Sequence, residues 1–384
     1  MHCVFVKRVS DLGVTEMKRV LFVTSEAVPF IKTGGLADVA GSLPKYFSKN
    51  EYEVSVMLPK YMCIREDMRK KMHHILHFYV DLGWRKQYVG ILEAKEDGIQ
   101  YYFIDNEQYF RRPGLYGYDD DNERFAFFDF AVLELMSHVD IKPDILHLHD
   151  WQTAMIATLY KERYAYYEYY QGIKIVFTIH NIAYQGKCDP KLLSDHFGLD
   201  NYLYYNGNCR NDGCFNMMKA AIYYSDVVTT VSPTYAQEIL TDSFGEGLQS
   251  ILQMRRHDLY GILNGIDYET INPSTDPEIV EHFDMTTVDE KKVNNKTALQ
   301  AECGLPVNPD VPLIGIVTRL TWQKGLDLII DRMDELMKRD VQVVILGAGD
   351  QKYEEPLKAM AAYHTQKLSL NLKYDFGLSC RIYA

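Results

Sequence analysis

The chain has 384 residues, of which 47% are hydrophobic and 24% are charged, a composition typical of a globular protein and a length that suits two α/β domains. Its net charge of −12 argues against a nucleic-acid partner, because neutralising phosphates requires a basic face. The cysteines include no Cys-x-x-Cys pair, no apolar run reaches the roughly 18 residues of a membrane span, and the N-terminus lacks a signal-peptide core, so we expect a cytoplasmic protein without a membrane partner.

Short runs rich in β-branched residues alternate with longer helical patterns along the first 260 or so residues. We predict helices at Arg124–His138 and Thr153–Tyr169, and strands at Val20–Val23, Val54–Leu58, Ile145–Leu148, Ile175–Ile179 and Val227–Val231. This order predicts a parallel sheet with helices on both faces.

A second series follows the segment "GILNGIDYETINPSTDPE". It comprises predicted helices at Leu326–Lys338 and Tyr353–Tyr363 and predicted strands at Leu313–Val317, Val341–Leu346 and Leu368–Tyr374. The simplest architecture is therefore two doubly wound α/β domains, residues 17–262 and 263–384, joined near residues 261–275. Ligands in such sheets bind beyond the carboxyl ends of the strands, and a cleft between two domains is a common binding site.

The turn "IKTGGLAD" lies between the first predicted strand and a helix predicted to start near Leu36. It matches neither the phosphate-binding P-loop nor the dinucleotide fingerprint. Gly34 and Gly35 tolerate positive φ and let backbone N–H groups approach a ligand, a helix N-terminus adds partial positive charge, and Lys32 adds a full charge. The turn is either an anion site or a tight βα turn with a solvated Lys32, and by itself it leaves both interpretations open.

Polar residues and glycines recur where other predicted strands end, in "DILHLHDW", "IVFTIHNIAYQG", "YGILNGID", "GIVTRLTWQKG" and "VVILGAGD". Each has an ordinary structural interpretation as a turn, a cap or a surface charge. As a set they predict a functional edge on both sheets. The residues concerned are His147, His149, Asp150, His180, Asn264, Arg319, Lys324, Gly347 and Gly349.

Two further patterns have local interpretations. In "VSPTYAQEI", Ser232 is a predicted N-cap with Pro233 at the first helical position. His147 and His149 alternate along a strand, which places both imidazoles on one face and would suit a metal-dependent hydrolase. Because Trp151 follows and no later His/Asp cluster completes a ligand set, we predict no metal.

These motifs, with "SEAVPFIKTGGLADVAGSLP", appear in an order that resembles the glycogen/starch synthase family from Met17 to the last residue. The resemblance implies two Rossmann-like doubly wound domains facing a cleft, the B-type glycosyltransferase fold, with the second domain incomplete. It implies retaining transfer of glucose from ADP-glucose to the non-reducing end of an α-1,4-glucan such as glycogen, with no metal or other cofactor. A glucan phosphorylase is disfavoured, since no segment resembles a pyridoxal phosphate site.

The resemblance also implies residue roles. Lys32 holds the donor diphosphate, with Gly34 and Gly35 bringing N–H groups close to it. From the other domain, Arg319 and Lys324 clamp the same diphosphate, and fixed cations of this kind lower the barrier to departure of a nucleoside diphosphate. By the same resemblance, His180, Asp150 and Asn264 contact the sugar of the donor. Gly347 and Gly349 form the turn beside its nucleotide.

Both ends of the chain depart from the family pattern. Residues 1–16 precede the position equivalent to the usual family start, Met17, and we expect them to be dispensable. The chain stops at "FGLSCRIYA", before the family's Glu-Pro-Cys-Gly-Leu motif, whose glutamate lies closest to the reacting centre. We expect a fragment of a glucosyltransferase that is inactive as it stands. The alternative is a catalytically dead nucleotide-sugar- or glucan-binding protein of the same fold.

Overall fold

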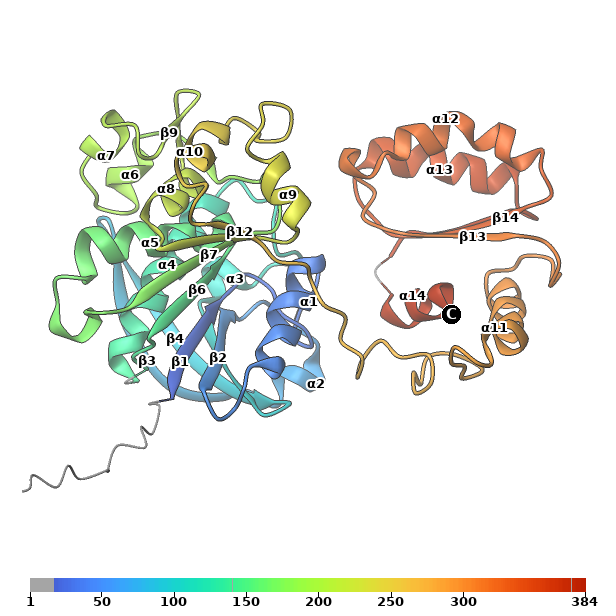
Figure 1. Cartoon of the computed structure of the whole chain (residues 1–384), viewed down its shortest axis with the longest axis horizontal. Coiled ribbons are helices and arrows are strands. Elements are labelled where there is room, and N and C mark those ends of the chain that lie inside the picture. The colour runs from blue at the N-terminus through green and yellow to red at the C-terminus, as the bar shows by residue number, and fades with distance from the viewer. Residues whose placement is uncertain (1–16, 140, 374) are drawn as a thin grey trace, which may run out of the picture. The chain divides into compact units, whose positions relative to one another are not determined.

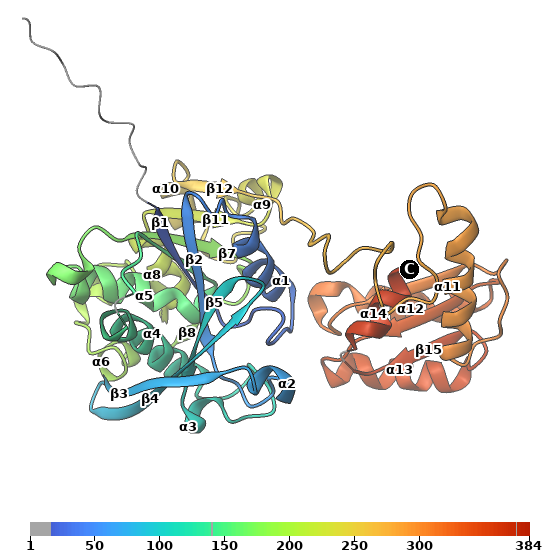
Figure 2. The ribbon, with the colours of Figure 1, turned by 90° about the horizontal axis from the view of Figure 1, so that it is seen from below.

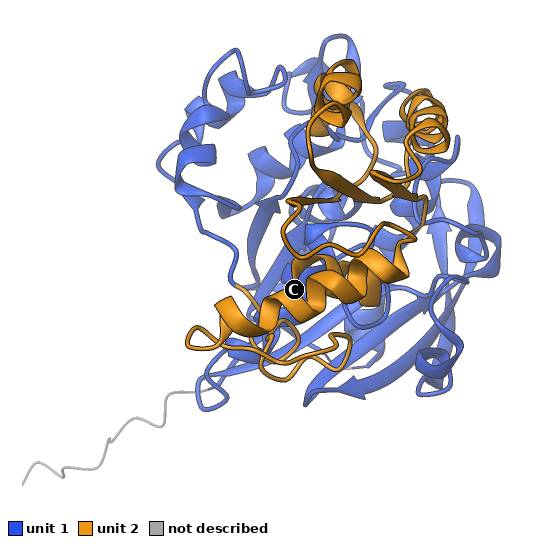
Figure 3. Ribbon diagram, turned by 90° about the vertical axis from the view of Figure 1, so that its right-hand side faces the viewer, with its two compact units in different colours: residues 1–265 blue, residues 266–384 orange. Residues whose placement is uncertain are grey.

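The computed structural model describes residues 17–384 except residues 140 and 374, so the predicted extension at residues 1–16 lies outside the described residues. Its contacts divide the chain into two compact units, unit 1 with residues 1–265 and unit 2 with residues 266–384 (Figure 3). Each unit is described by itself below.

Among the described residues of unit 1, nine strands form one sheet in the order β12-β11-β7-β6-β1-β2-β5-β4-β3 (Figure 1). Seven of them, from β12 to β5 in this order, run parallel, and β4 is antiparallel to both β5 and β3. The strand order reverses between β1 and β6, so the loops that follow these two strands diverge. In a Rossmann-like sheet this is the point where a ligand-binding crevice forms. The strands are β1 (Lys18–Val23), β2 (Tyr52–Pro59), β3 (His73–Leu82), β4 (Arg85–Glu96), β5 (Ile99–Asp105), β6 (Ile145–His149), β7 (Lys174–Ile179), β11 (Val227–Thr230) and β12 (Leu259–Gly261).

The five strands predicted in this half are confirmed as β1, β2, β6, β7 and β11. Four strands of this sheet were not predicted: the parallel strands β5 and β12, and the strands β3 and β4, which form an antiparallel hairpin at one edge of the sheet. In β3, exposed and buried positions alternate from His77 to Leu82, and this period-2 pattern is the signal for a half-buried strand. The expectation of a parallel sheet therefore holds for the middle of the sheet and is wrong at this edge.

The predicted helix Arg124–His138 is confirmed within α4 (Asp121–His138). Its residues from Arg124 to Leu133 are all buried, because α4 packs between the sheet and α5 and has no solvent-exposed face there. Helices α4, α5 (Ala154–Leu159) and α8 (Met217–Tyr224) pack together on one face of the sheet, and α1 (Gly35–Ser42) lies on the opposite face (Figures 1 and 2).

The single helix predicted over Thr153–Tyr169 is wrong. The chain instead forms the 3₁₀ turn η2 (Trp151–Thr153), α5, the π-helical turn η3 (Tyr160–Tyr164) and the 3₁₀ turn η4 (Glu168–Tyr170). The N–H of Ala165 donates to the carbonyl of Tyr160, five residues back, at 2.8 Å, so the helix widens at this point. The Tyr160 hydroxyl then donates to the carbonyl of Tyr170 at 3.0 Å and ties the turn to the segment that follows.

Shorter elements complete unit 1. The prediction for Ser232 and Pro233 is confirmed, because Ser232 caps α9 (Pro233–Glu238) by accepting the N–H of Tyr235 at 3.3 Å. A small antiparallel sheet has the order β8-β10-β9. The remaining elements are η1 (Leu43–Tyr46), α2 (Glu66–Arg69), α3 (Glu107–Phe110), α6 (Leu192–Asp195), α7 (Tyr202–Tyr205), α10 (Gln249–Met254), β8 (Lys187–Cys188), β9 (Arg210–Asn211) and β10 (Cys214–Asn216).

The described residues of unit 2 contain a three-stranded parallel sheet in the order β13-β14-β15. Its strands β13 (Leu313–Val317), β14 (Gln342–Leu346) and β15 (Leu368–Asn371) confirm the three predicted strands, and α12 (Leu326–Met337) and α13 (Gln351–Tyr363) confirm the two predicted helices. Helices α12 and α13 cover one face, and α11 (Val288–Glu302) and α14 (Phe376–Tyr383) lie on the other (Figures 1 and 2).

Two glycines after β14 permit a close crossing of two loops. A Cβ atom at Gly347 would lie 1.8 Å from the carbonyl oxygen of Thr318, and one at Gly349 would lie 2.3 Å from the carbonyl oxygen of Leu320. The segment after β13 runs against the segment after β14 here, with a bridge between Leu320 and Gly349. Both glycines therefore have a steric reason to be glycine.

We predict that Gly349→Ala destabilises unit 2 by about 1–3 kcal/mol, because the new methyl group meets main-chain atoms that cannot rotate away. Urea denaturation measures the change. Gly265→Ala is the control, since a Cβ atom there meets nothing within 4 Å, and we expect it to stay within about 0.5 kcal/mol of the parent. An unchanged midpoint for Gly349→Ala would contradict the close crossing.

Candidate functional site

The candidate site in unit 1 lies where β1, β6 and β7 end. These strands are neighbours in parallel register, with Val23 beside Leu148 and His149 beside Thr178. The loop with Lys32 follows β1, the turn with Asp150 follows β6, and His180 follows β7. The structure therefore brings these three predicted segments of unit 1 to one edge of the sheet.

The loop after β1 is held by a buried carboxylate that the sequence analysis did not single out. Glu26 is 3% exposed, and its carboxylate accepts the main-chain N–H of Thr33 and, at 2.8 Å, the hydroxyl of Thr33. Because charge-assisted hydrogen bonds are strong and this one is shielded from water, Glu26 orders the Thr33-Gly34-Gly35 backbone. Its position directly after a buried strand was the available sequence signal.

Lys32 is not simply solvated. Its side chain is 24% exposed, and Nζ lies 2.7 Å from Oδ1 of Asp38, in the first turn of α1. The ion pair holds the Lys32 ammonium group beside the N-terminus of α1, where the first backbone N–H groups lack intrahelical partners. The N-cap residue, Gly34, has no side chain that could cap them. The arrangement is suited to bind an anion.

Gly34 and Gly35 do not use the positive φ that glycine tolerates. Gly34 has φ −161°, an extended conformation open to any residue, and Gly35 begins α1. A Cβ atom at Gly35 would meet nothing within 4 Å, and one at Gly34 would approach only Glu26, at 4.0 Å. What the two glycines supply is open space beside their N–H groups.

Asp150 has a strained backbone, with φ 57° and ψ −176°. This region of conformational space is nearly restricted to glycine and costs about 1–3 kcal/mol. Its Oδ1 accepts the main-chain N–H of His180 at 2.7 Å and that of Asn181 at 3.3 Å. Burial raises the pKa of the Asp150 carboxyl to about 7. The two hydrogen bonds lower this pKa in part, and the nearby carboxylate of Glu26 raises it. Asp150 thus caps the β7 loop, a role that its residue type also suits.

The imidazole rings of His147, His149 and His180 pack together close to Asp150. The rings of His147 and His149 stack with centroids 4.3 Å apart, which confirms that they share one face of β6. His147 Nε2 lies 2.7 Å from the hydroxyl of Thr178, and His149 Nδ1 lies 3.0 Å from Nε2 of His180. Burial lowers the pKa of His147 to about 3, that of His180 to about 4, and that of His149 well below its ordinary value. All three rings are therefore neutral near pH 7.

A pocket of about 310 Å³ is lined in part by Trp151, the residue that follows Asp150. It combines aromatic faces with carboxylate, amide and ammonium groups, the mixture expected where a polar ligand must be oriented. Residues from the turn after β6, the loop after β7 and the start of α4 contribute to it. Its lining includes Asp121, Trp151, Tyr184, Gln185, Lys187 and Glu246.

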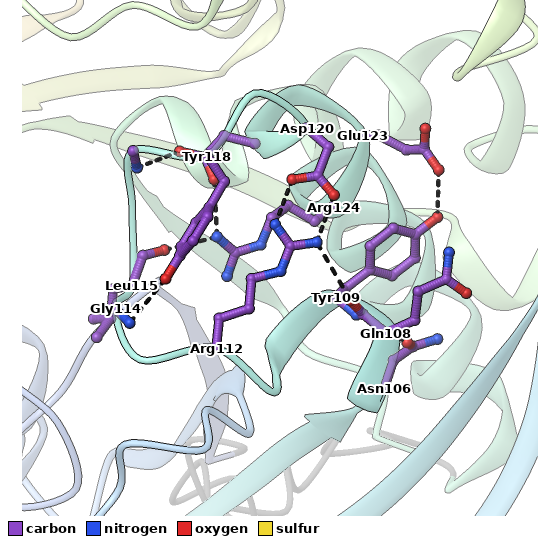
Figure 4. Close-up of polar contacts among 12 residues, drawn as sticks. Asn106, Gln108, Tyr109, Arg112, Gly114, Leu115, Tyr118, Asp120, Glu123 and Arg124 are labelled. Carbon is purple, nitrogen blue, oxygen red and sulfur yellow. Dashed lines mark hydrogen bonds and ion pairs between the residues drawn. The ribbon is translucent and has the colours of Figure 1, made fainter.

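The loop 111–120, which precedes the pocket residues Asp121 and Asn122, is braced by arginines (Figure 4). Arg112 forms a two-point ion pair with Asp120, and the fully buried Arg124 donates to the carbonyl of Leu115 at 2.9 Å. The braced loop carries Tyr116, whose hydroxyl lies 2.7 Å from that of Ser25, directly after β1. The two loops therefore support each other.

In unit 2, Arg319 and Lys324 are exposed and follow β13, with Lys324 at the end of η5 (Trp322–Lys324). Within the described part of the chain, neither side chain takes part in an ion pair. Gly347 and Gly349 follow β14 and adjoin the same segment through the crossing described above. Asn264, also exposed, lies in the irregular segment after β12.

The described residues were considered for a metal site and for a membrane-spanning helix. Over residues 17–384, apart from 140 and 374, no group of three or more His, Cys, Asp or Glu side chains is arranged to hold a metal ion. In the same part of the chain, the helices are too short or too polar to span a membrane.

The chain is similar to proteins of known family. The sequence profile of the starch synthase catalytic domain matches residues 19–254. The chain is 48% identical over 366 residues to a glycogen synthase of Streptococcus agalactiae serotype Ia, a match that covers 95% of this chain and 77% of the relative. It is 49% identical over 367 residues to a glycogen synthase of Clostridium botulinum (strain Alaska E43 / Type E3), with the same coverage.

Solved structures agree. The catalytic domain of starch synthase IV from Arabidopsis thaliana, bound to ADP and acarbose, matches with a TM-score of 0.87 and 34% identity over 96% of this chain and 76% of that one. An α,α-trehalose-phosphate synthase from Burkholderia xenovorans matches with a TM-score of 0.53 and 12% identity over 95% of this chain and 77% of that one. At that identity, the second match shows the fold alone.

We predict that His147→Gln makes stability less dependent on pH. The folded-state pKa of His147, about 3, lies below that of an unfolded histidine, so folding stability from this group is present above roughly pH 6.5 and is lost as the pH falls. Glutamine can still bond Thr178 but does not titrate. Between about pH 5.5 and 4, urea-derived unfolding free energies should fall less steeply in the variant, by up to about 1.4 kcal/mol per pH unit. Parallel profiles would contradict a neutral His147.

Proposed function

The chain belongs to the family of glycogen and starch synthases, which are glycosyltransferases, and from this premise we propose that it serves the transfer of glucose from ADP-glucose to the non-reducing end of an α-1,4-glucan, with retention of configuration. The observation that carries the proposal is the placement of Lys32 at the N-terminus of α1, beside the point where the strand order reverses between β1 and β6. Phosphates bind at such points in doubly wound sheets.

Lys32 and the first turn of α1 are proposed to bind the donor diphosphate. Nζ of Lys32 supplies a full charge, and the helix N-terminus, whose N-cap residue Gly34 has no side chain, supplies N–H donors at Gly34 and Gly35. Asp38 already holds Lys32 at 2.7 Å, so the ammonium group is oriented before the ligand arrives. An oriented cation loses less entropy on binding than a free one.

Arg319 and Lys324 are proposed to bind the same diphosphate. Both are exposed cations on the segment after β13. Positive side chains beside the departing nucleoside diphosphate stabilise the negative charge that develops on it in the transition state. Gly347 and Gly349 adjoin this segment, and we place the nucleotide beside them. The bound ADP in the starch synthase IV structure supports an adenine nucleotide.

His180 and Asp150 are proposed to contact the donor glucose, together with Asn264. The half-buried ring of His180 is tethered by its main chain to Asp150 and by Nε2 to His149, so that it is rigidly placed. Rigid polar groups fix a sugar in one orientation, which is the requirement for transfer with defined stereochemistry.

The 310 Å³ pocket is proposed to receive the glucan. Tyr184, 45% exposed, and Trp151 offer aromatic faces, and the carboxylates of Asp121 and Glu246 offer acceptors for sugar hydroxyls. The pocket lining includes residues of the segment after β7, which also carries His180, and this supports a sugar acceptor close to the sugar donor. The starch synthase IV structure is bound to acarbose as well as ADP, which supports a saccharide ligand for this chain.

We predict that Lys32→Ala weakens ADP binding by about 1.5–3 kcal/mol, or about 10- to 150-fold, because it removes a charge-assisted contact to the diphosphate. Isothermal titration calorimetry measures the change. Lys60→Ala is the matched control, because Lys60 is similarly shielded, at 25% exposure, and similarly paired, with Asp105 at 3.1 Å. Unchanged ADP affinity in folded Lys32→Ala protein would refute the role of the loop.

We predict that Tyr184→Ala weakens binding of a linear α-1,4-glucan oligosaccharide about 3- to 10-fold and leaves ADP affinity unchanged, because an aromatic contact contributes about 0.5–1.5 kcal/mol. Tyr167→Ala, which removes a tyrosine that is 64% exposed and not part of the pocket lining, should change neither affinity. Equal effects of both substitutions on glucan binding would show that the pocket is not the acceptor site.

A further inference from the structure

His149 is fully buried and has two ring nitrogens in different situations. Its Nδ1 lies 3.0 Å from Nε2 of His180, and its Nε2 has no hydrogen-bond partner among the described residues. The ring stacks on His147, with centroids 4.3 Å apart, and on Phe22, with centroids 5.3 Å apart. These contacts prevent the ring from turning its other nitrogen towards His180.

The main chain of His149 is also held. The hydroxyl of Thr153 accepts the N–H of His149 at 2.8 Å and lies 3.0 Å from its carbonyl oxygen. Because both the backbone and the ring of His149 are fixed, the direction in which Nδ1 points is fixed as well. His149 is therefore a rigid partner for His180.

The hydrogen bond between Nδ1 of His149 and Nε2 of His180 requires one proton, carried by one of these two nitrogens. Both rings are neutral near pH 7, since burial lowers the pKa of each. A neutral imidazole carries one N–H and one lone pair, so one ring must donate and the other must accept. The two possible arrangements leave different groups at the buried Nε2 of His149.

If His149 accepted at Nδ1, its own proton would sit on Nε2, as a buried N–H without an acceptor. If His149 donates from Nδ1, Nε2 keeps only an unused lone pair. Orphaned buried N–H groups are rare in proteins, and unsatisfied acceptors are less so. The geometry therefore favours donation from His149 to His180.

We propose that His149 is a positioning residue that donates its Nδ1–H to Nε2 of His180 and thereby keeps the proton of His180 on Nδ1. His180 then presents an N–H, rather than a lone pair, from the nitrogen that His149 does not use. An N–H in this place recognises an oxygen acceptor, such as a hydroxyl of the donor sugar. This last step rests on the proposed function of His180, whereas the assignment of the proton does not.

Two variants of similar size separate hydrogen bonding from packing. His149→Asn places an amide near the position of Nδ1 and can still donate to His180, and His149→Leu cannot. We expect the wild-type protein and His149→Asn to hold the proton of His180 on Nδ1. In His149→Leu the proton should move towards Nε2. The ¹⁵N shifts of histidine-labelled protein report this, with the His180 signals identified by their absence in His180→Gln.

Ligand binding provides the second measurement. His180 is assigned to the sugar and not to the nucleotide, so His149→Leu should weaken ADP-glucose binding about 3- to 10-fold relative to the wild type and leave ADP binding unchanged. His149→Asn should retain most of the ADP-glucose affinity. A merely structural role would change the two affinities together, so their ratio separates the two explanations.

The outcomes are distinguishable. If His180→Ala leaves the ratio of ADP-glucose to ADP affinity unchanged, the proposed function of His180 is wrong, and the ¹⁵N shifts still decide the position of its proton. A wild-type His180 protonated on Nε2 would overturn the inference. So would a His149→Leu protein that retains the wild-type affinity ratio while His180→Ala loses it.

Discussion

The parallel pairing of β1 with β2 on one side and with β6 on the other is the constraint on which the rest of unit 1 depends. Because the chain leaves β1 towards one face of the sheet and β6 towards the other, the loops after these strands separate at the sheet edge. The separation places the N-terminus of α1, with Gly34 as its N-cap residue, at this edge, and Asp150 lies close enough to Glu26 for their charges to interact. Lys32, Gly34, Gly35, Asp150 and His180 lie on the segments that follow β1, β6 and β7, whereas Asn264 follows β12.

The same edge concentrates features that reduce stability. Asp150 has a strained backbone and a carboxyl group whose pKa burial raises, and His149 carries a buried nitrogen without a partner among the described residues. Strain and unsatisfied polar groups of this kind persist where the surrounding structure enforces them, and they cluster at functional sites. Here the enforcing structure is a mainly apolar sheet core, in which Phe22, Leu146 and Phe177 are fully buried.

The sequence predicted most strands of the two parallel sheets, because buried parallel strands are continuous apolar runs with little ambiguity. It failed at the hairpin β3–β4, whose alternation was not recognised, and at Thr153–Tyr169, where a helical pattern continues through a π-helical turn. It predicted Lys32 as a charge near a helix N-terminus but not its partner Asp38. Glu26 was missed, and the contact of His149 with His180 was not foreseen, because a buried charge and an imidazole pair are defined by contacts between distant segments.

The sequence by itself determined the family, most of the buried parallel strands in both units, and the residue types available at their ends, since these depend on local pattern and on motifs. Only the tertiary structure decided which of those residues touch. The contact of His149 with His180 joins positions 31 residues apart, and that of Ser25 with Tyr116 joins positions 91 apart. Such contacts follow from the register of neighbouring strands and the path of the loops, which local sequence does not specify.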